Sequence, residues 1–133
     1  MTYSERGIVL DCDSEHLLGI LSQPSTACDT GVVIIVGGPQ YRAGSHRQFV
    51  LLARHLAAAG FPVLRFDTRG MGDSSGVFPG FEHIGPDIAS AISALCREAP
   101  TVRRIVLWGL CDAASAAMIN GMADARISGL VLL

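Results

Sequence analysis

The amino-acid sequence predicts an α/β fold in three layers, with a mostly parallel β-sheet between two layers of helices. Apolar segments of strand length alternate along the chain with segments of helical periodicity. Several of the strand candidates are continuous apolar runs, as expected of strands that are covered on both faces. Half of the residues are hydrophobic and 17% are charged, a composition that suits a well-buried core.

The front of the chain predicts a hairpin followed by a buried strand and a helix. Two short apolar segments, 7–12 and 17–21, flank four polar residues and are expected to pair as strands. Proline, serine and aspartate within 23–30 indicate a loop. The apolar run 31–36 predicts a buried strand that two glycines and a proline end. A helix is expected over 47–59, and the glycine that follows it ends it.

The rest of the chain continues the alternation of strands and helices. Between two of these strands, four apolar residues recur at helical spacing and form one buried face: Ile88, Ala91, Ile92 and Leu95. In order, the expected elements are a strand over 61–66, a helix that Pro100 ends, a strand over 104–109, a helix over 112–122 and a buried strand over 127–133.

The end of the last strand is unusual for a complete domain. Leu133 closes an apolar strand without a polar exit or a covering helix. A flat apolar strand at the edge of a sheet invites self-association. We therefore expect residues 1–133 to form a single, incomplete domain, the front part of a longer one, which can associate with itself through this sheet edge.

Composition and charge exclude several classes of function. The formal net charge is −2 and no basic block is present, so nucleic acid is not an expected partner. The four cysteines form no cluster with metal-ligand spacing, and we expect neither a metal nor a cofactor. The N-terminus lacks the apolar core of a signal peptide, and no apolar run is long enough to span a membrane. We expect a cytoplasmic protein with free thiols.

The strand at 104–109 leads to the residue on which the functional prediction depends. The sequence Gly109-Leu110-Cys111-Asp112-Ala113 turns an apolar strand directly into a small-residue helix. This is the layout of a nucleophile elbow, in which the residues two before and two after the nucleophile must be small. Cys111 would point outward at the end of the strand, where the helix N-terminus favours the thiolate. We interpret Cys111 as the nucleophile and the other three cysteines as ordinary small side chains.

Three segments resemble the α/β-hydrolases in their order and spacing. GVVIIVGGP resembles the third strand and oxyanion turn of that family, FPVLRFDTRGMGDS its fourth strand and the loop that follows, and WGLCDA its fifth strand and elbow. The longer combination GGPQYRAGSHRQF…LARHLAAAGFPVLRFDTRGMGDSSG is similar to hydrolase 1 of the exosortase A system of exopolysaccharide-producing bacteria. This resemblance implies that the protein hydrolyses an ester or thioester of a small acyl compound. It does not imply which compound is the substrate.

The chain departs from the family pattern at three positions. Cys111 stands where serine is usual, as in the dienelactone hydrolases. Ala113 replaces the last glycine of the elbow motif, which is a mild change. Val36 replaces the histidine that often precedes the oxyanion glycines, so a hydrogen bond that fixes the loop is absent.

Backbone N–H groups are the expected donors to the oxyanion of a tetrahedral intermediate. The first is the N–H of Asp112, one residue past the nucleophile. The second should follow the 31–36 strand, where Pro39 has no N–H, so Gly38 is preferred and Gln40 is the alternative. Gly37 and Gly38 could instead serve only to turn the chain.

The general base is missing from the sequence pattern. In this fold the nucleophile comes before the acid and the histidine, but all four histidines precede Cys111. The only acids after it are Asp112 and Asp124, so no complete triad is expected. His46 could approach the site as a substitute base, or could simply anchor the following helix. We predict negligible hydrolysis by the 133 residues.

Other interpretations of the chain remain open. In the resembling family the charged loop with Asp67, Arg69 and Asp73 is structural, although it could suggest a metal or phosphate site. A dinucleotide-binding domain is disfavoured because no G-x-G-x-x-G turn opens a helix. A non-catalytic fragment, or a half-domain that binds a partner, is the third possibility.

Overall fold

The computed structural model describes residues 2–133, and it confirms the three-layer α/β fold. Its elements in chain order are β1 (Tyr3–Cys12), β2 (Glu15–Pro24), β3 (Thr30–Ile35), the short 3₁₀ helix η1 (Ser45–Arg47), α1 (Gln48–Ala58), β4 (Val63–Phe66), the 3₁₀ helix η2 (Phe81–His83), α2 (Gly85–Glu98), β5 (Arg104–Gly109), α3 (Asp112–Asn120) and β6 (Ile127–Leu132).

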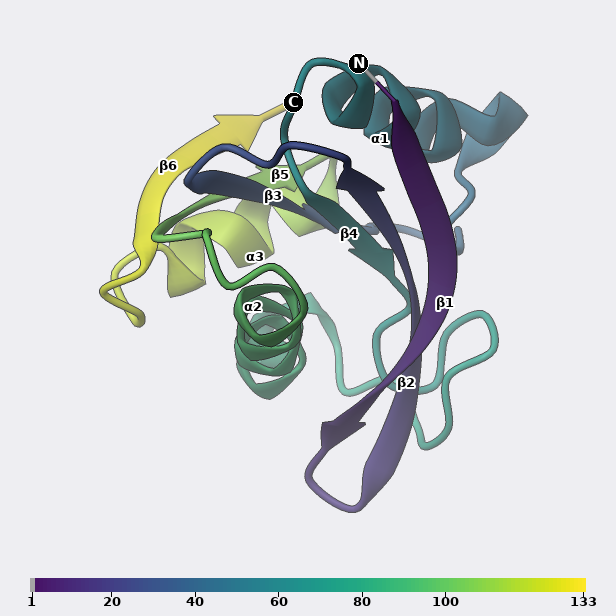
Figure 1. Ribbon diagram of the computed structural model, residues 1–133. Coiled ribbons are helices and arrows are strands. Elements are labelled where there is room, and N and C mark those ends of the chain that lie inside the picture. Colours follow the sequence, from purple (N-terminus) through teal and green to yellow (C-terminus); the bar gives the residue numbers. More distant parts are fainter. Residues whose placement is uncertain (1) are drawn as a thin grey trace.

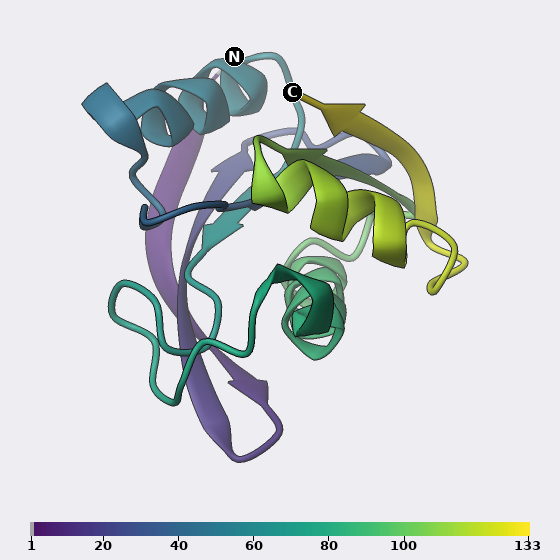
Figure 2. The ribbon, with the colours of Figure 1, turned by 180° about the vertical axis from the view of Figure 1, so that it is seen from behind.

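The six strands form one sheet in the order β1-β2-β4-β3-β5-β6. β4, β3, β5 and β6 run parallel, whereas β2 pairs antiparallel with both β1 and β4. Helix α1 covers one face, and α2 and α3 cover the other (Figures 1 and 2). The long hairpin of β1 and β2 extends beyond the rest of the sheet (Figure 1).

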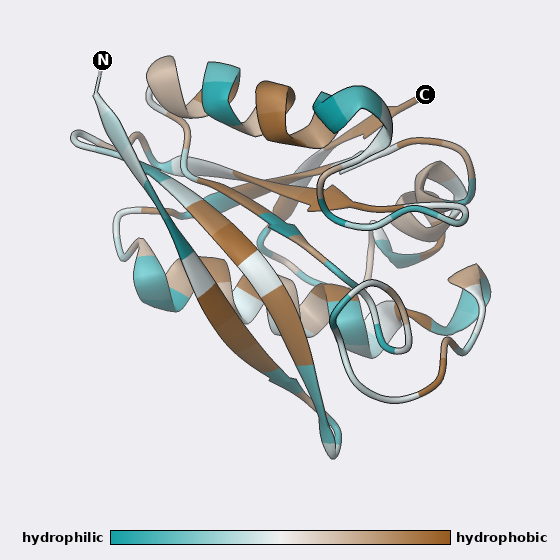
Figure 3. Cartoon of the chain, turned by 90° about the vertical axis from the view of Figure 1, so that its right-hand side faces the viewer, coloured by the Kyte–Doolittle hydropathy of each residue, from teal (hydrophilic) through white to brown (hydrophobic). Residues whose placement is uncertain are grey.

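Alternation along the central strand explains both halves of the core. In β3, Val32 and Ile34 pack with Phe49 of α1, while Val33 and Ile35 point to the opposite face. The larger cluster of buried side chains lies on that opposite face. It includes the four apolar residues predicted to form one face of a helix, all of which are buried: Ile88, Ala91, Ile92 and Leu95. Figure 3 shows the resulting apolar bands along the strands.

Several predicted boundaries were wrong by a few residues. The hairpin strands begin at Tyr3 and end at Pro24, because polar residues continue the antiparallel ladder where one face is exposed. The first helix begins at Gln48, because His46 and Arg47 have left-handed backbone conformations. The last helix ends at Asn120 instead of residue 122.

The last strand was expected to be buried, and this expectation was wrong. β6 pairs with β5 along one side only, and Leu130, Val131 and Leu132 each keep about two-fifths of their surface exposed. No other described strand covers its outer side, since β6 is the end of the sheet. Among residues 2–133, no helix has the length and hydrophobicity needed to cross a membrane.

Candidate active site

The pairing of β3 with β5 brings the two glycine-containing turns together. Ile35, the last residue of β3, lies opposite Gly109, the last residue of β5. The two strands are parallel, so the segments that follow them leave the sheet at the same end of the strands. The turn that contains Gly37 and Gly38 therefore lies beside the turn that contains Cys111.

Cys111 has the backbone geometry of a strained turn. Its φ is 58° and its ψ is −125°, a combination that costs a non-glycine residue about 1–3 kcal/mol. Cys111 immediately precedes helix α3 and is exposed to solvent. A strained, exposed cysteine at the junction of a buried strand and a helix has the placement that an elbow nucleophile requires.

The small residues around the turn are required by close backbone contacts. A Cβ at Gly37 would lie 2.6 Å from both the amide nitrogen of Ala113 and the carbonyl oxygen of Leu110. A Cβ at Gly109 would collide with the carbonyl of Ala113. Gly37 thus does more than turn the chain, because it lets the turn after β3 rest directly on the elbow.

The backbone N–H groups of Asp112 and Gly38 are the two donors expected from the sequence. Neither forms a hydrogen bond within the described loops and turns. The N–H of Gln40, the alternative donor, instead donates to the carbonyl oxygen of Gly38 at 2.9 Å. Gly38 has a φ of 65° and would meet no atom within 4 Å of an added Cβ, so its surroundings are open.

Leu133, which directly follows β6, forms two hydrogen bonds with the elbow. The N–H of Cys111 donates to the carbonyl oxygen of Leu133 at 2.9 Å, and the N–H of Leu133 donates to the carbonyl oxygen of Gly109 at 3.0 Å. These two bonds enclose the turn from the side opposite Gly37. These bonds could not be predicted from the sequence, since an apolar strand pattern contains no information on the neighbours of the strand.

No histidine in residues 2–133 forms a hydrogen bond with the Cys111 thiol. His46 lies in η1, exposed, before α1. His16 pairs instead with Asp11, with 3.0 Å between Nδ1 and Oδ1. Downstream of the elbow, Asp124 forms an ion pair with Arg126, whose hydrogen bond lowers the pKa of that carboxyl. Neither Asp124 nor any histidine of residues 2–133 therefore forms a hydrogen bond with the Cys111 thiol.

The charged loop after β4 is structural, as its resemblance implied. Arg69 donates through its backbone N–H and its Nε to the two carboxylate oxygens of Asp87, which is fully buried in α2. Asp67, also fully buried, accepts hydrogen bonds from Arg42 and from the N–H of Asp73. The roles of Arg42 and Asp87 were missed, because no short motif links residues that lie far apart in the sequence.

The cysteine at the end of β1 is unsuited to nucleophilic chemistry. Burial, ahead of the charge of Asp87, raises the pKa of the Cys12 thiol from 9.0 to about 11.

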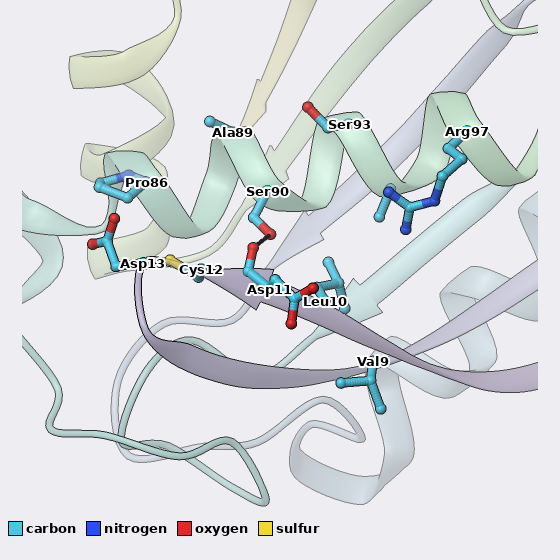
Figure 4. Close-up of a pocket in the computed structure, with 11 residues that line it drawn as sticks. Val9, Leu10, Asp11, Cys12, Asp13, Pro86, Ala89, Ser90, Ser93 and Arg97 are labelled. Carbon is cyan, nitrogen blue, oxygen red and sulfur yellow. Dashed lines mark hydrogen bonds between the residues drawn. The ribbon is translucent and has the colours of Figure 1, made fainter.

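A surface cavity of about 400 Å³ lies beside Cys12, between the end of β1 and α2. Figure 4 shows this cavity with Ser90 and Arg97 on its helical side. It does not include any residue of the elbow or of the turn after β3.

No group of three or more histidine, cysteine, aspartate or glutamate side chains in residues 2–133 is arranged to hold a metal ion. The glycines that follow β4 lead into an irregular loop and then η2, not directly into a helix. This arrangement disfavours the dinucleotide-binding alternative.

Comparison with solved structures identifies the fold. An esterase from Pyrococcus furiosus matches with a TM-score of 0.82 and 20% identity over 96% of this chain and 48% of its own. A cold-adapted esterase from an Arctic intertidal metagenomic library matches with a TM-score of 0.79 and 21% identity, over 99% and 61%. A lidless α/β serine hydrolase from Xanthomonas campestris matches with a TM-score of 0.76 and 19% identity, over 97% and 62%.

This chain therefore spans about half the length of the first esterase and about three-fifths of the other two. No curated protein matches the sequence. A family model described as serine aminopeptidase, S33, matches residues 28–133, the part of the chain from the loop before β3 to the end of β6. The chain belongs to this S33 family of α/β-hydrolases.

Proposed function

We propose that the chain carries the nucleophile and oxyanion donors of an acyl hydrolase that acts on a small ester or thioester. Cys111 is the proposed nucleophile, and the N–H groups of Asp112 and Gly38 are the proposed oxyanion donors. The observation that carries this proposal is the strained, exposed Cys111 beside two N–H groups that form no hydrogen bond within the described loops and turns. A merely structural cysteine has no need of this conformation.

The proposed chemistry is nucleophilic catalysis through an acyl-cysteine. The Cys111 thiolate attacks the carbonyl carbon, a C–S bond forms, and the carbonyl electron pair moves to the oxygen between the two donors. Collapse of this intermediate breaks the bond to the leaving alkoxide or thiolate. Water then cleaves the thioester, a step that needs a general base.

The proposed nucleophile is tested with p-nitrophenyl acetate and iodoacetamide. We expect acylation of Cys111 with release of a single equivalent of p-nitrophenolate and negligible continued turnover, because the base is missing. Cys111→Ala should abolish this release. Peptide mass spectrometry should also show that iodoacetamide modifies Cys111 faster than Cys12 or Cys28.

Two results would contradict the proposal in different ways. Alkylation of Cys111 no faster than that of Cys28, the partly exposed thiol, would show that the elbow does not activate its cysteine. Sustained ester turnover that Cys111→Ala abolishes would show that a base is present after all. Cys28→Ala is the matched control, since it removes a partly exposed thiol away from the elbow.

The finer assignment is to a longer hydrolase of the exosortase-associated group. It is supported by the segments 37–49 and 52–76, on which the sequence resemblance rests. We propose that residues 1–133 are one incomplete domain of such an enzyme, with the acid and the histidine in a region that this sequence does not include. The four unpaired cysteines favour a reducing compartment, the cytoplasm.

A second candidate function is association through the open edge of the sheet. Leu130, Val131 and Leu132 at this edge are each about two-fifths exposed. Next to them, Trp108, Val131 and Leu52 help to line an apolar cavity of about 290 Å³. A half-domain that binds a second copy through β6 would use this surface without any catalysis.

A further inference from the structure

We propose that Arg42 is a positioning residue for acyl transfer, because its contacts hold the loop that carries the Gly38 N–H in place. This inference rests on the proposed function. It assigns a role to an ion-pair network that lies on the loop between β3 and α1 and does not contact the nucleophile.

The first end of this loop is fixed by the elbow itself. Gly37 lies against the backbone of Leu110 and Ala113, so closely that a Cβ there would come within 2.6 Å of either. Gly38 follows with a left-handed φ of 65°, and its carbonyl accepts the N–H of Gln40 at 2.9 Å. An added Cβ at Gly38 would meet nothing within 4 Å, so the space on that side of the residue is open. The direction of its N–H then depends on how the neighbouring parts of the loop are held.

The second end is fixed by Arg42 through three of its groups. The backbone N–H of Arg42 donates to Asp67 Oδ1 at 2.7 Å, and its carbonyl oxygen accepts a bond from Arg65 Nη1 at 3.3 Å. Its side-chain Nη1 donates to Asp67 Oδ2 at 2.6 Å and to Asp73 Oδ2 at 2.7 Å. One residue of the loop is thus held to the end of β4 by its amide, its carbonyl and its guanidinium.

Burial makes this attachment strong. The Asp67 side chain is fully buried and the Arg42 side chain is 17% exposed, so water competes weakly for their hydrogen bonds. Burial alone would lower the pKa of Arg42, but hydrogen bonds to Asp73 and Asp67 raise it above its ordinary value, and the guanidinium stays charged. Arg65, itself buried, keeps the carbonyl side of Arg42 in place.

The consequence concerns the geometry of one donor. An oxyanion donor stabilises the transition state only if its N–H already points at the developing charge, and removing one such donor costs about 100- to 1,000-fold in rate. Releasing Arg42 removes one anchor of this loop, while Gln40 Oε1 still accepts hydrogen bonds from the N–H of Ser45 at 3.1 Å and from Gln48 Nε2 at 3.4 Å. We expect a smaller loss than complete removal of the donor, about tenfold.

The test compares two reactions of the same sulfur. Acylation of Cys111 by p-nitrophenyl acetate passes through an oxyanion, whereas alkylation by iodoacetamide does not. Arg42→Ala should lower the rate of acylation at Cys111 about tenfold and leave its alkylation rate within about twofold. Arg42→Lys, which keeps the positive charge, should recover part of the acylation rate. Arg104→Ala is the matched control, because it removes an exposed ion pair at the opposite end of β5.

Folding is monitored in the same samples through Cys12, which is buried and should resist iodoacetamide in every folded variant. If Arg42→Ala exposes Cys12, Asp73→Asn takes its place, because Asp73 is 62% exposed and the bonds to Asp67 remain. Asp73→Asn should then lower the ratio of acylation to alkylation at Cys111, but by less than the roughly tenfold change expected for Arg42→Ala.

The outcomes separate the two proposals. An unchanged ratio in folded Arg42→Ala, or in Asp73→Asn if Arg42→Ala does not fold, would overturn the positioning role alone. If p-nitrophenyl acetate acylates Cys111 of the wild type no faster than Cys28, the proposed function would be overturned instead.

Discussion

At the scale of single residues, the site depends on positions where almost no side chain is tolerated. Gly37 and Gly109 allow two turns to touch, and Cys111 takes the strain of the turn between β5 and α3. The identity of these positions could be predicted from the sequence, because the elbow is a local motif. The contact of Gly37 with the elbow could not, because it joins residues from different strands.

The two glycines of the turn after β3 should respond differently to alanine. Gly37→Ala forces backbone atoms apart and should lower the free energy of unfolding by about 3 kcal/mol. Gly38→Ala meets no neighbouring atom, so only its positive φ is costly, by about 1 kcal/mol. Urea denaturation of both variants measures the difference. Equal losses would contradict the close contact at Gly37.

The buried thiol of Cys12 should make stability depend on alkaline pH. Its pKa is raised from 9.0 to about 11, mainly by burial, so the unfolded thiol ionises before the folded one. The unfolded chain then binds fewer protons, and the free energy of unfolding falls as the pH rises from about 9 towards about 11. Urea denaturation across this window should show a steeper fall in the wild type than in Cys12→Ala. Parallel curves for the two proteins would exclude this effect of the thiol.

At the scale of elements, two buried ion pairs connect loops that the sequence pattern leaves separate. Arg69 joins the loop after β4 to the first turn of α2 through Asp87, and Arg42 joins the loop after β3 to the end of β4 through Asp67. The strands and helices themselves were predictable, because their periodicity is local. The pairing of these charges depends on tertiary distance, so Arg42 and Asp87 could not be selected from the sequence.

The position of an ion pair should decide its contribution to stability. Arg69→Ala leaves the fully buried Asp87 without its cation and should cost about 3–5 kcal/mol. Arg104→Ala removes a pair whose side chains are both more than half exposed and should cost less than about 1 kcal/mol. Chemical denaturation tests both variants under the same conditions. A loss at Arg104 as large as that at Arg69 would argue against this account.

At the scale of the whole molecule, the sheet is covered unevenly. Three helices cover its central strands, while β6 is exposed at one end and the β1–β2 hairpin forms the other (Figure 1). The fold class and the order of the elements were predictable from alternating strand and helix patterns. The open sheet edge at β6 was also expected from its apolar end, whereas the burial predicted for its residues was wrong, because an apolar run looks the same whether or not a neighbour covers it.

Self-association through β6 should respond to a charge on that strand. Val131→Lys places a cation at the edge and should shift the chain towards monomer, as charged side chains on natural edge strands do. Val77→Lys is the control, since Val77 is 85% exposed in the loop between β4 and η2 and is not part of β6. Sedimentation velocity over a range of concentrations gives the distribution of species. A wild-type chain that stays monomeric throughout would remove the basis for this association.

The two hydrogen bonds between Leu133 and the elbow have a consequence for biosynthesis. Translation produces Cys111 well before Leu133, yet the backbone around the cysteine is enclosed only when the carbonyl and N–H of Leu133 reach it. The backbone around Cys111 therefore cannot be fully enclosed before residue 133, which directly follows β6, has been synthesised.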